Sequence, residues 1–462
     1  MPGAAHPFGN TMALAKAPHG HASIGTMSNR RQIAPIRFGY GLRLGEEAPA
    51  DPEAWLERQI VSPAAPPTGV GTAEAMRTRA ESIRQNRTAP PQDQGMGPPS
   101  PNALQAMVQA ESRAWAAHRL ASPEPFRDRL VDFWANHFTV SRRSGVVGAL
   151  AGALEREAIR PHVTGRFADM LVAVTRHPAM LGYLDNHQSV GPDSTFGRRS
   201  GRGLNENLAR ELLELHTLSP AGGYSQADVQ QLAEILTGWG VALEEEPWGF
   251  VWRRQNHQPG SKTLLGRTFS SGPDSQEEAL RFLAEHPATY RHLALQLARH
   301  FVADTPPPSA TQRLEAVLRD SGGDLAAVSR ALIALPEAWP ARPAKFRQPK
   351  DLVLAAARAV GLDRGDLVVS GMGALGQALW NAPQPNGWPD RAEDWIAPEA
   401  LMRRLDWAYT FAGRVSRLDP RAVSEAALGP LARAETVAAM RGAGSVRDAL
   451  TLLFLSPEFG HR

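Results

Sequence analysis

The spacing of apolar residues beyond position 103 is the feature that most constrains this chain. Residues such as Leu104, Met107 and Val108 recur at intervals of three and four, which places them on one face of an α-helix. The same period returns in most later segments, whereas residues 248–270 break it with alternating aromatic residues and a Pro-Gly turn. The sequence therefore predicts a mainly α protein, in which one large multi-helix domain carries a small β-hairpin insertion.

Stretches rich in proline and glycine mark the expected boundaries between regions of the chain. The leader leaves open whether Met1 or Met27 starts the protein. In chain order, we expect a disordered leader over 1–30, an N-terminal motif and helix over 31–62, a Pro/Gly-rich linker over 63–102, and the helical domain over 103–462 with its β-hairpin near 248–270.

The composition excludes several classes of protein. An apolar fraction of 42 % is enough for a sizeable core, and the absence of cysteine excludes disulfides and thiolate nucleophiles. Fifty basic and 47 acidic residues leave a net charge of +3. Nucleic-acid binding is typically indicated by a basic stripe with interleaved aromatic residues, and the sequence has no such stripe, so we expect no nucleic-acid partner. No apolar run approaches the roughly 18 residues that a membrane span requires.

The N-terminal region bears on the cellular location. Arg30 and Arg31 are similar to the start of a twin-arginine export signal, but residues 32–37 are too polar and too few for the apolar region of such a signal. We therefore favour a cytoplasmic protein, and a periplasmic or secreted one stays open.

A helix expected over 205–218 carries the first candidate site. Glu206, Arg210 and Glu214 follow one another at intervals of four, while Glu211 and Glu214 share a face. Two carboxylates three residues apart are typical of helical metal sites, and they also suit acid–base chemistry. The alternative is structural: Arg210 would neutralise Glu206 and Glu214 in a buried ion network.

A second candidate cluster combines short polar motifs from separate segments. His137 follows an aromatic run and is a candidate catalytic group, although a buried histidine is also a common core residue. Asp185 ends a short helix whose following Gly/Ser loop suits a pocket cover. We expect Asp185 to join His137, Glu211 and Glu214 as a catalytic residue. The residues expected to bind substrate nearby are Asn136, Asn186, Asn205, Glu206 and Arg210.

Two loops offer further binding residues. His257 and Lys262 flank a Pro-Gly turn, where the lysine could meet an anionic group, although turn formation alone explains Pro-Gly. Trp388 and Trp395 lie in a loop rich in proline and glycine. Such tryptophans suit stacking on sugar rings or contact with a partner, and the alternative is that both fill the helical core.

Several motifs occur together in an order typical of one bacterial family. They are Arg37-Phe38-Gly39-Tyr40-Gly41, Phe133-Trp134-Ala135-Asn136-His137-Phe138, His177-Pro178-Ala179-Met180-Leu181, Leu184-Asp185-Asn186, the segment 205–218, Gly223-Tyr224, Thr237-Gly238-Trp239, His257 to Lys262, and Gly387-Trp388-Pro389. From about residue 33 onward, the chain resembles the family called domain of unknown function 1800. The resemblance implies a mostly helical fold, and a protein partner encoded by a neighbouring gene.

Two departures from that family pattern affect its use. Where members usually have His-Asp before Pro-Gly, this chain has His257-Gln258, which removes a carboxylate and weakens a metal or acid–base role for the loop. Many members also carry an export signal, which this chain lacks as far as the sequence indicates.

The residues and the resemblance lead to two functional hypotheses. The first is an enzyme with a polar Glu/His/Asn pocket, a hydrolase acting on a glycan or another polar polymer. The second is a non-catalytic helical scaffold that binds a partner protein encoded nearby. The sequence identifies no cofactor and leaves both metal binding and oligomeric state open.

Overall fold

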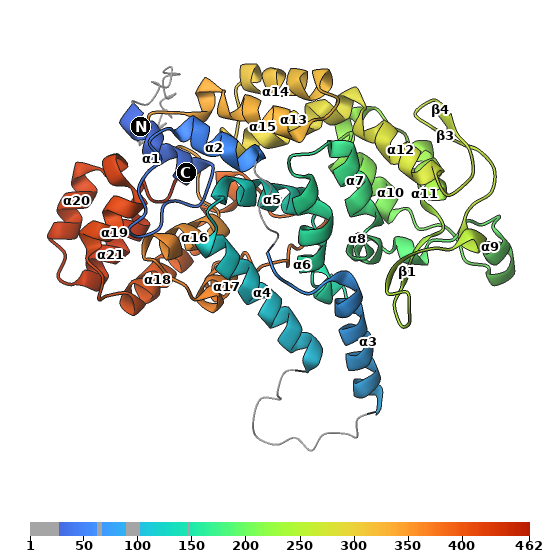
Figure 1. The fold of residues 1–462 in the computed structure, drawn as a ribbon, viewed down its shortest axis with the longest axis horizontal. Coiled ribbons are helices and arrows are strands. Elements are labelled where there is room, and N and C mark those ends of the chain that lie inside the picture. Colours follow the sequence, from blue (N-terminus) through green and yellow to red (C-terminus); the bar gives the residue numbers. More distant parts are fainter. Residues whose placement is uncertain (1–26, 62–66, 89–101, 146) are drawn as a thin grey trace, which may run out of the picture.

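The structure is a computed structural model that describes residues 27–61, 67–88, 102–145 and 147–462 (Figure 1). Most of the predicted leader and part of the predicted linker lie outside these ranges. The described residues form 21 α-helices and two small antiparallel sheets of two strands each. This confirms the predicted fold class, a mainly α protein with a small β insertion.

The elements before the sheets are all helical. Their bounds are α1 (Met27–Arg37), α2 (Pro52–Val61), α3 (Thr72–Thr88), α4 (Ala103–Ala121), α5 (Pro125–His137), α6 (Ala151–Leu154), α7 (Phe167–Arg176), α8 (Pro178–Tyr183), α9 (Thr195–Ser200), α10 (Asn207–Glu211) and α11 (Gln226–Leu236). The strands are β1 (Trp239–Ala242), β2 (Gly249–Trp252), β3 (Lys262–Leu264) and β4 (Arg267–Phe269).

The elements after the sheets are again helices. Their bounds are α12 (Ser275–Ala284), α13 (Pro287–Phe301), α14 (Pro308–Asp320), α15 (Leu325–Ile333), α16 (Pro349–Ala359), α17 (Gly365–Ala374), α18 (Pro398–Arg414), α19 (Pro420–Ala427), α20 (Ala434–Arg441) and α21 (Val446–Leu455).

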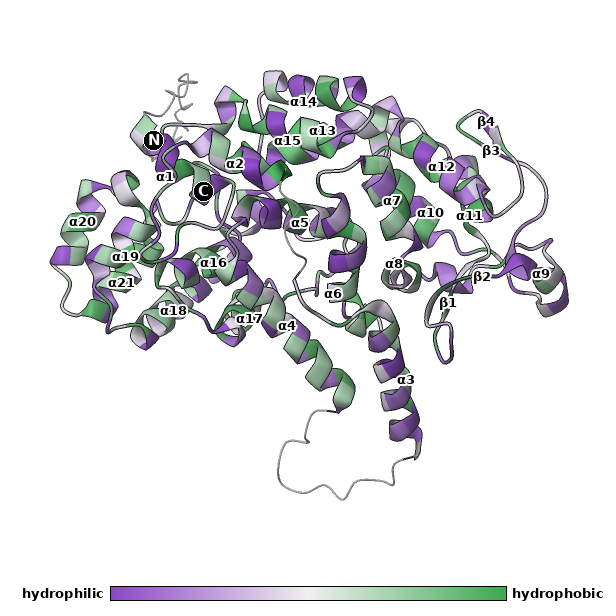
Figure 2. Ribbon diagram, viewed as in Figure 1, coloured by the Kyte–Doolittle hydropathy of each residue, from purple (hydrophilic) through white to green (hydrophobic). Residues whose placement is uncertain are grey.

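The helices form an elongated body with the sheets at one end and the C-terminal helices at the other (Figure 1). The C-terminal end of α3 and the N-terminal end of α4 project away from this body (Figure 1), and α3 is predominantly hydrophilic (Figure 2). The first described helix, α1, lies against the C-terminal helices, where the Gln32 side-chain amide donates to the carbonyl of Ala426 at 3.2 Å. Both ends of the described chain therefore meet in one part of the fold.

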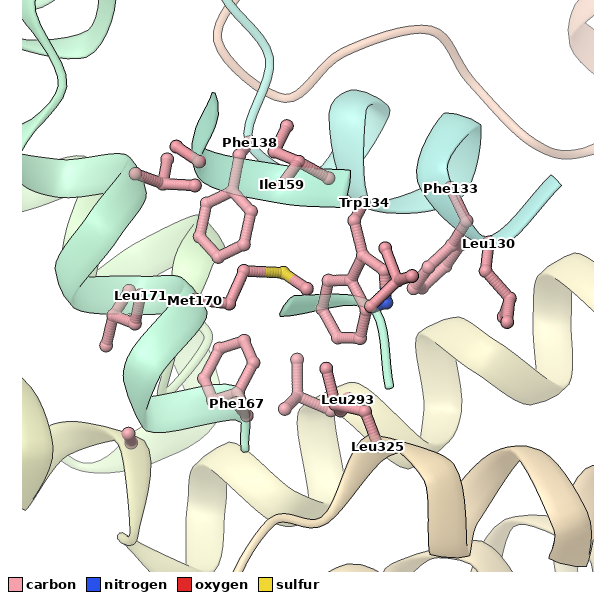
Figure 3. Close-up of a cluster of buried hydrophobic side chains, with 14 of the residues drawn as sticks. Leu130, Phe133, Trp134, Phe138, Ile159, Phe167, Met170, Leu171, Leu293 and Leu325 are labelled. Carbon is pink, nitrogen blue, oxygen red and sulfur yellow. The ribbon is translucent and has the colours of Figure 1, made fainter. Parts of the chain in front are cut away.

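Two apolar clusters stabilise the body. The larger cluster joins α5, α7, α13 and α15, and its centre contains Trp134, Phe138 and Phe167 (Figure 3). The smaller cluster joins α4 to α16–α21, and includes Leu354 and Phe454. Burial of these side chains from water supplies most of the stabilising free energy, at roughly 1.5–3 kcal/mol for each large residue.

A seam of buried charged residues lies between the two apolar clusters. Arg119 on α4 donates to Asp132 on α5 at 2.6 Å and to Glu155 at 2.5 Å. Arg129 on α5 pairs with Asp351 on α16 at 3.2 Å. Each of these side chains is almost fully buried, so every charge depends on its partner for the solvation it has lost.

Local sequence signals for helix starts are confirmed. The Ser225 hydroxyl accepts from the Asp228 amide while the Asp228 carboxylate accepts from the Ser225 amide, and this capping box begins α11. The His177 imidazole accepts from the Ala179 amide at 3.1 Å, and Pro178 occupies the first turn of α8.

The segment 205–218 is not one regular α-helix as predicted. α10 ends at Glu211, and a wider π-helical turn covers Leu212–His216. The Thr217 hydroxyl donates to the Leu212 carbonyl at 2.6 Å, which satisfies a carbonyl at the end of this turn. A π-helical turn contains one more residue than an α-helical turn. Glu214 is therefore rotated about the helix axis relative to the position that it would have in a regular α-helix.

The β insertion contains two hairpins instead of one. β1 pairs with β2 in the register Trp239 to Trp252, and β3 pairs with β4 in the register Lys262 to Phe269. The single hairpin expected near 248–270, with its turn at Pro-Gly, is therefore wrong in its strand pairing. Each strand pairs with its neighbour in sequence, which closes shorter loops than the predicted pairing would.

Candidate functional site

A polar cavity of about 420 Å³ opens between α5, α13, the start of α16 and the loop that contains Trp388. We call it the central cavity, and it lies at the seam between the two apolar clusters. Its lining residues are Asp132, Phe133, Asn136, His137, Leu215, Gln296, Arg299, His300, Gln348, Lys350, Gln377, Asn386, Trp388, Pro389, Asp390, Arg391, Glu393 and Asp394.

Asn136 fixes the Trp388 loop to the end of α5. Its side-chain amide donates to the Trp388 carbonyl at 2.9 Å, and its Oδ1 accepts from the Trp388 backbone amide at 2.8 Å. These two bonds use both polar atoms of the Asn136 side chain. The predicted binding residue Asn136 thus shapes the cavity by positioning a wall.

Trp388 is half-buried and lines the cavity, whereas Trp395 is buried behind it. The two ring centroids lie 6.1 Å apart, and the Trp395 indole donates to the Pro389 carbonyl at 3.0 Å. Of the two alternatives for these tryptophans, Trp395 fills the interior and Trp388 remains available as an aromatic wall.

His137, a predicted catalytic residue, also lies in the cavity wall. Its Nε2 donates to the His216 carbonyl at 3.1 Å, because a carbonyl can only accept. Nδ1 therefore carries the lone pair of the neutral ring. Burial, followed by the neighbouring histidines His216 and His292, holds the pKa of His137 well below its usual value.

His300 and Asp390 form a pair that the sequence analysis missed. The His300 Nδ1 donates to Asp390 Oδ2 at 3.0 Å, and His300 Nε2 is buried without a hydrogen-bond partner among the described residues. Burial lowers the pKa of His300 to about 4, against the opposing effect of the Asp390 charge. At neutral pH the ring is uncharged, with Asp390 fixing its tautomer.

Asp390 stays ionised because several donors surround it. Gln348 donates to Asp390 Oδ1 at 2.7 Å, and the Lys345 ammonium lies 3.7 Å from the same oxygen. Burial alone would raise the pKa of Asp390, but His300, Lys345 and Arg462 hold it well below its usual range.

Asp132 forms part of the cavity floor. It accepts from Arg119, and the Tyr40 hydroxyl donates to its other oxygen, Oδ2, which lies 3.2 Å from the Lys350 ammonium. Burial opposes ionisation of Asp132, but the Arg119 and Lys350 charges lower its pKa overall. Lys350 is thereby already paired.

Glu211 and Glu214, the other predicted catalytic residues on the segment 205–218, do not line the central cavity. Burial and then the Glu214 charge raise the pKa of Glu211. Arg210 pairs with Glu206 at 3.0 Å and with Gln226 at 3.0 Å. Within the described residues Arg210 makes no ion pair with Glu214, so only half of the predicted ladder forms.

The remaining residues of the second cluster serve the local backbone. Asp185 adopts a left-handed conformation with φ of 56°, and its carboxylate accepts from Gln188 at 3.2 Å. Asn186 donates to the carbonyls of Leu236 and Trp239, both at 3.3 Å. These contacts place Asp185 and Asn186 beside β1 and outside the residues that line the central cavity.

Asn205 also supports its own segment. Its Oδ1 accepts from the Asn207 amide at 2.9 Å, and its backbone amide donates to the Ser189 hydroxyl at 3.0 Å. The structure therefore brings together only Asn136, His137 and Trp388 of the predicted site residues at the central cavity.

The loop between β2 and β3 is held by its own backbone. Lys262 is 2 % exposed, and its ammonium donates to the carbonyls of Gln258 and Gly260. His257 Nδ1 lies 2.9 Å from the Thr237 carbonyl. Lys262 is therefore engaged by carbonyl oxygens in this structure, not by an external anion.

In the ranges that the structure describes, no three His, Asp or Glu side chains are grouped closely enough to hold a metal ion. In the same ranges no helix combines the length and apolar character needed to cross a bilayer.

Comparison with known protein families matches residues 34–461 to the family described as Protein of unknown function (DUF1800). The match covers nearly the whole chain. The chain belongs to the DUF1800 family. No curated protein matches it at a significant level, and no solved structure does.

Membership of the DUF1800 family confirms the resemblance identified in the sequence motifs. At the position where Gln258 departs from the DUF1800 pattern, its side-chain amide donates to Asp193 Oδ2 at 3.0 Å and accepts from the Asp193 backbone amide at 3.0 Å. A carboxylate is thus present beside this loop, supplied by another segment.

Arg299, His300 and Asp390 are among the cavity residues that the sequence analysis missed. Asp390 directly follows the motif Gly387-Trp388-Pro389, so extending that motif by one residue would have included it. His300 and Arg299 lie at the polar end of an apolar helix and form no motif of their own.

Proposed function

We propose that the protein is a hydrolase of a polar polymer and that it cleaves an ester bond of that polymer in the central cavity. The observation that supports this proposal is the pair formed by His300 and Asp390 in the cavity wall, with an uncharged imidazole whose Nε2 has no partner in the described residues. An orphaned buried nitrogen costs about 1–3 kcal/mol, so it is a candidate for function.

In the proposed reaction, His300 acts as a general base toward water. It takes one proton while the oxygen adds to the ester carbonyl carbon, and Asp390 stabilises the resulting imidazolium. When the bond between the carbonyl carbon and the alcohol oxygen breaks, His300 returns the proton to that oxygen. The acid product then loses its own proton to solvent, which leaves the enzyme unchanged.

The carboxylates of the cavity favour an ester over a glycosidic bond. Glycoside hydrolysis ordinarily requires one carboxyl group with a raised pKa as the acid. The pKa values of Asp132 and Asp390 are both lowered by neighbouring cations. The rim residue Glu393 is exposed and pairs with Arg391 at 3.1 Å. The proposal assigns no catalytic role to Glu211, Glu214 or Asp185.

A substrate screen tests the proposal. Purified full-length protein is incubated with acetylated glycans, and acetate release and new reducing ends are measured separately. We expect acetate release that His300→Gln lowers at least a hundredfold, while His187→Gln, outside the cavity, leaves the rate unchanged. Reducing ends without acetate, or equal rates for His300→Gln and the parent, would contradict the proposal.

An exposed apolar stripe favours a second function, binding of the partner protein encoded nearby. Leu401, Met402, Leu405 and Tyr409 on α18 are each at least 44 % exposed. Arg403, Asp406 and Arg414 line the groove beside the stripe, and Arg403 pairs with Glu399 at 2.5 Å, so the border carries charges of both signs. Co-expression with the neighbouring gene product followed by mass measurement tests this, and Leu405→Glu abolishes the complex if the stripe is the contact.

A further inference from the structure

Arg299 is a cation in the wall of the central cavity that lacks a counter-ion among the residues the structure describes. It lies on α13 one residue before His300, and its side chain is among those that line the cavity. Within the described part of the chain, no carboxylate oxygen lies within 4.0 Å of the guanidinium, and its Nε is buried without a hydrogen-bond partner. A half-buried guanidinium in this situation has lost part of its hydration without an ionic partner in exchange.

Three of the four acidic side chains that line the cavity have other partners. Asp132 binds Arg119, Asp390 binds His300, and Glu393 binds Arg391. The last carboxylate, Asp394, is exposed at the rim and stays beyond ion-pair distance of Arg299. The Arg299 charge also affects a neighbouring histidine. Burial is the largest cause of the lowered pKa of His292, and the charge of Arg299 lowers that pKa further.

The neighbours of Arg299 indicate what it recognises. Gln296, one turn earlier on α13, adds an amide to the same wall. The half-buried Trp388 is an aromatic surface in the same cavity, of the kind on which sugar rings stack. A guanidinium offers paired N–H donors that match the two oxygens of a carboxylate or a sulfate.

We propose that Arg299 binds an anionic substituent, a carboxylate or a sulfate, on the glycan that enters the central cavity. The substrate class is then an acidic glycan. This inference rests on the proposed function, since it names the polymer on which the hydrolase acts. The anion placed at Arg299 positions the chain so that its ester reaches the neighbouring His300.

Binding experiments with full-length protein test this inference without turnover. Calorimetric titration uses two acidic probes, oligogalacturonate and a sulfated oligosaccharide, neither of which carries an acyl ester. Each is compared with its neutral counterpart, the carboxyl-reduced or the desulfated oligosaccharide. We expect at least one acidic probe to bind about tenfold more tightly than its neutral counterpart. The two acidic probes distinguish a carboxylate from a sulfate as the bound group.

Two variants connect the preference with Arg299. Arg299→Gln removes the charge and is expected to abolish the preference, with a ten- to hundredfold loss of affinity for the acidic probe. Arg299→Lys retains the charge and restores part of the affinity. Arg291→Gln is the matched control, because Arg291 lies on the same helix with 71 % of its side chain exposed and does not line the cavity.

The outcomes separate this inference from the proposed function. Equal affinity for acidic and neutral probes, weak binding of both, or a preference that survives Arg299→Gln would overturn the inference, even if acetate release is observed. If an acidic probe binds in an Arg299-dependent way but no ester is hydrolysed, the inference about the anion site holds. The proposal that the protein is a hydrolase is then contradicted.

Discussion

The His300 Nδ1 donates to Asp390 Oδ2 over 3.0 Å, although 90 residues separate the two in sequence. One residue lies at the end of α13 and the other in the loop after Trp388, so the pair closes one side of the central cavity. Asp390 is itself oriented by Gln348. The imidazole is therefore held in one tautomer by a carboxylate that cannot easily move.

Asp390→Asn is expected to lower ester hydrolysis about a hundredfold or more. The amide no longer stabilises the imidazolium and can present its NH₂ group to His300 in place of an acceptor. Steady-state rates with an acetylated glycan measure the loss, and circular dichroism checks the fold. An unchanged rate for Asp390→Asn in folded protein would exclude His300 as a carboxylate-supported base.

The pH dependence of the rate follows from the lowered pKa of His300, which is about 4. The base form is the unprotonated ring, so activity is constant at neutral pH and falls as the pH drops through about 4. In Asp390→Asn the stabilising negative charge is absent, so this acid limb moves to lower pH. A pH–rate profile of kcat/KM for both proteins measures the shift, and an acid limb near 6.5 in the parent would contradict the assignment.

Protein stability is expected to fall in acid because of His216. Burial lowers the pKa of His216 to about 3, whereas an unfolded histidine has a pKa of about 6.5. The unfolded state therefore binds a proton that the folded state does not, so stability is complete above about 6.5 and is lost as the pH falls toward 3, by roughly 1.4 kcal/mol per pH unit. His216→Leu should make urea unfolding less pH-dependent in that window.

Asn136→Ala is expected to loosen the Trp388 loop. It removes both hydrogen bonds to Trp388, and the free energy of unfolding should fall by about 2 kcal/mol. The tryptophan emission should shift to longer wavelength as Trp388 gains solvent. Gln384→Ala, at an exposed position of the same loop, serves as the control and should change neither quantity.

Arg119→Met is expected to be strongly destabilising. Arg119 is fully buried and pairs with Asp132 and Glu155, so its removal leaves buried carboxylates without their cation. Such a loss typically costs 3–5 kcal/mol. Chemical denaturation measures it, with Arg113→Met on the exposed face of the same helix as the control. Equal stability of the two variants would contradict the importance of the charged seam.

Helix positions could be predicted from the sequence because their causes are local. Apolar spacing and the capping pair Ser225 and Asp228 act within a few residues, and the structure has the expected helix there. The π-helical turn over Leu212–His216 was not predictable in the same way, because its leucines also fit a regular helix. The prediction of which strands pair was also wrong. Alternating aromatic residues predict a strand, but they do not determine the strand with which it pairs.

The candidate site was only partly predictable. Asn136, His137 and Trp388 were found because each belongs to a compact motif of polar and aromatic residues. Arg299 and His300 were missed because their role depends on the cavity, which forms only when α13 packs beside the Trp388 loop. A single basic residue at a helix end carries no such signal in the sequence.

The position of the charged seam affects how the protein unfolds when a molecule occupies the central cavity. The central cavity is lined by α5 and α13, whose apolar residues belong to the larger cluster, and by the start of α16, whose apolar residues belong to the smaller one. A molecule bound in the cavity would contact elements of both clusters. The two clusters would then unfold together, in one cooperative thermal transition.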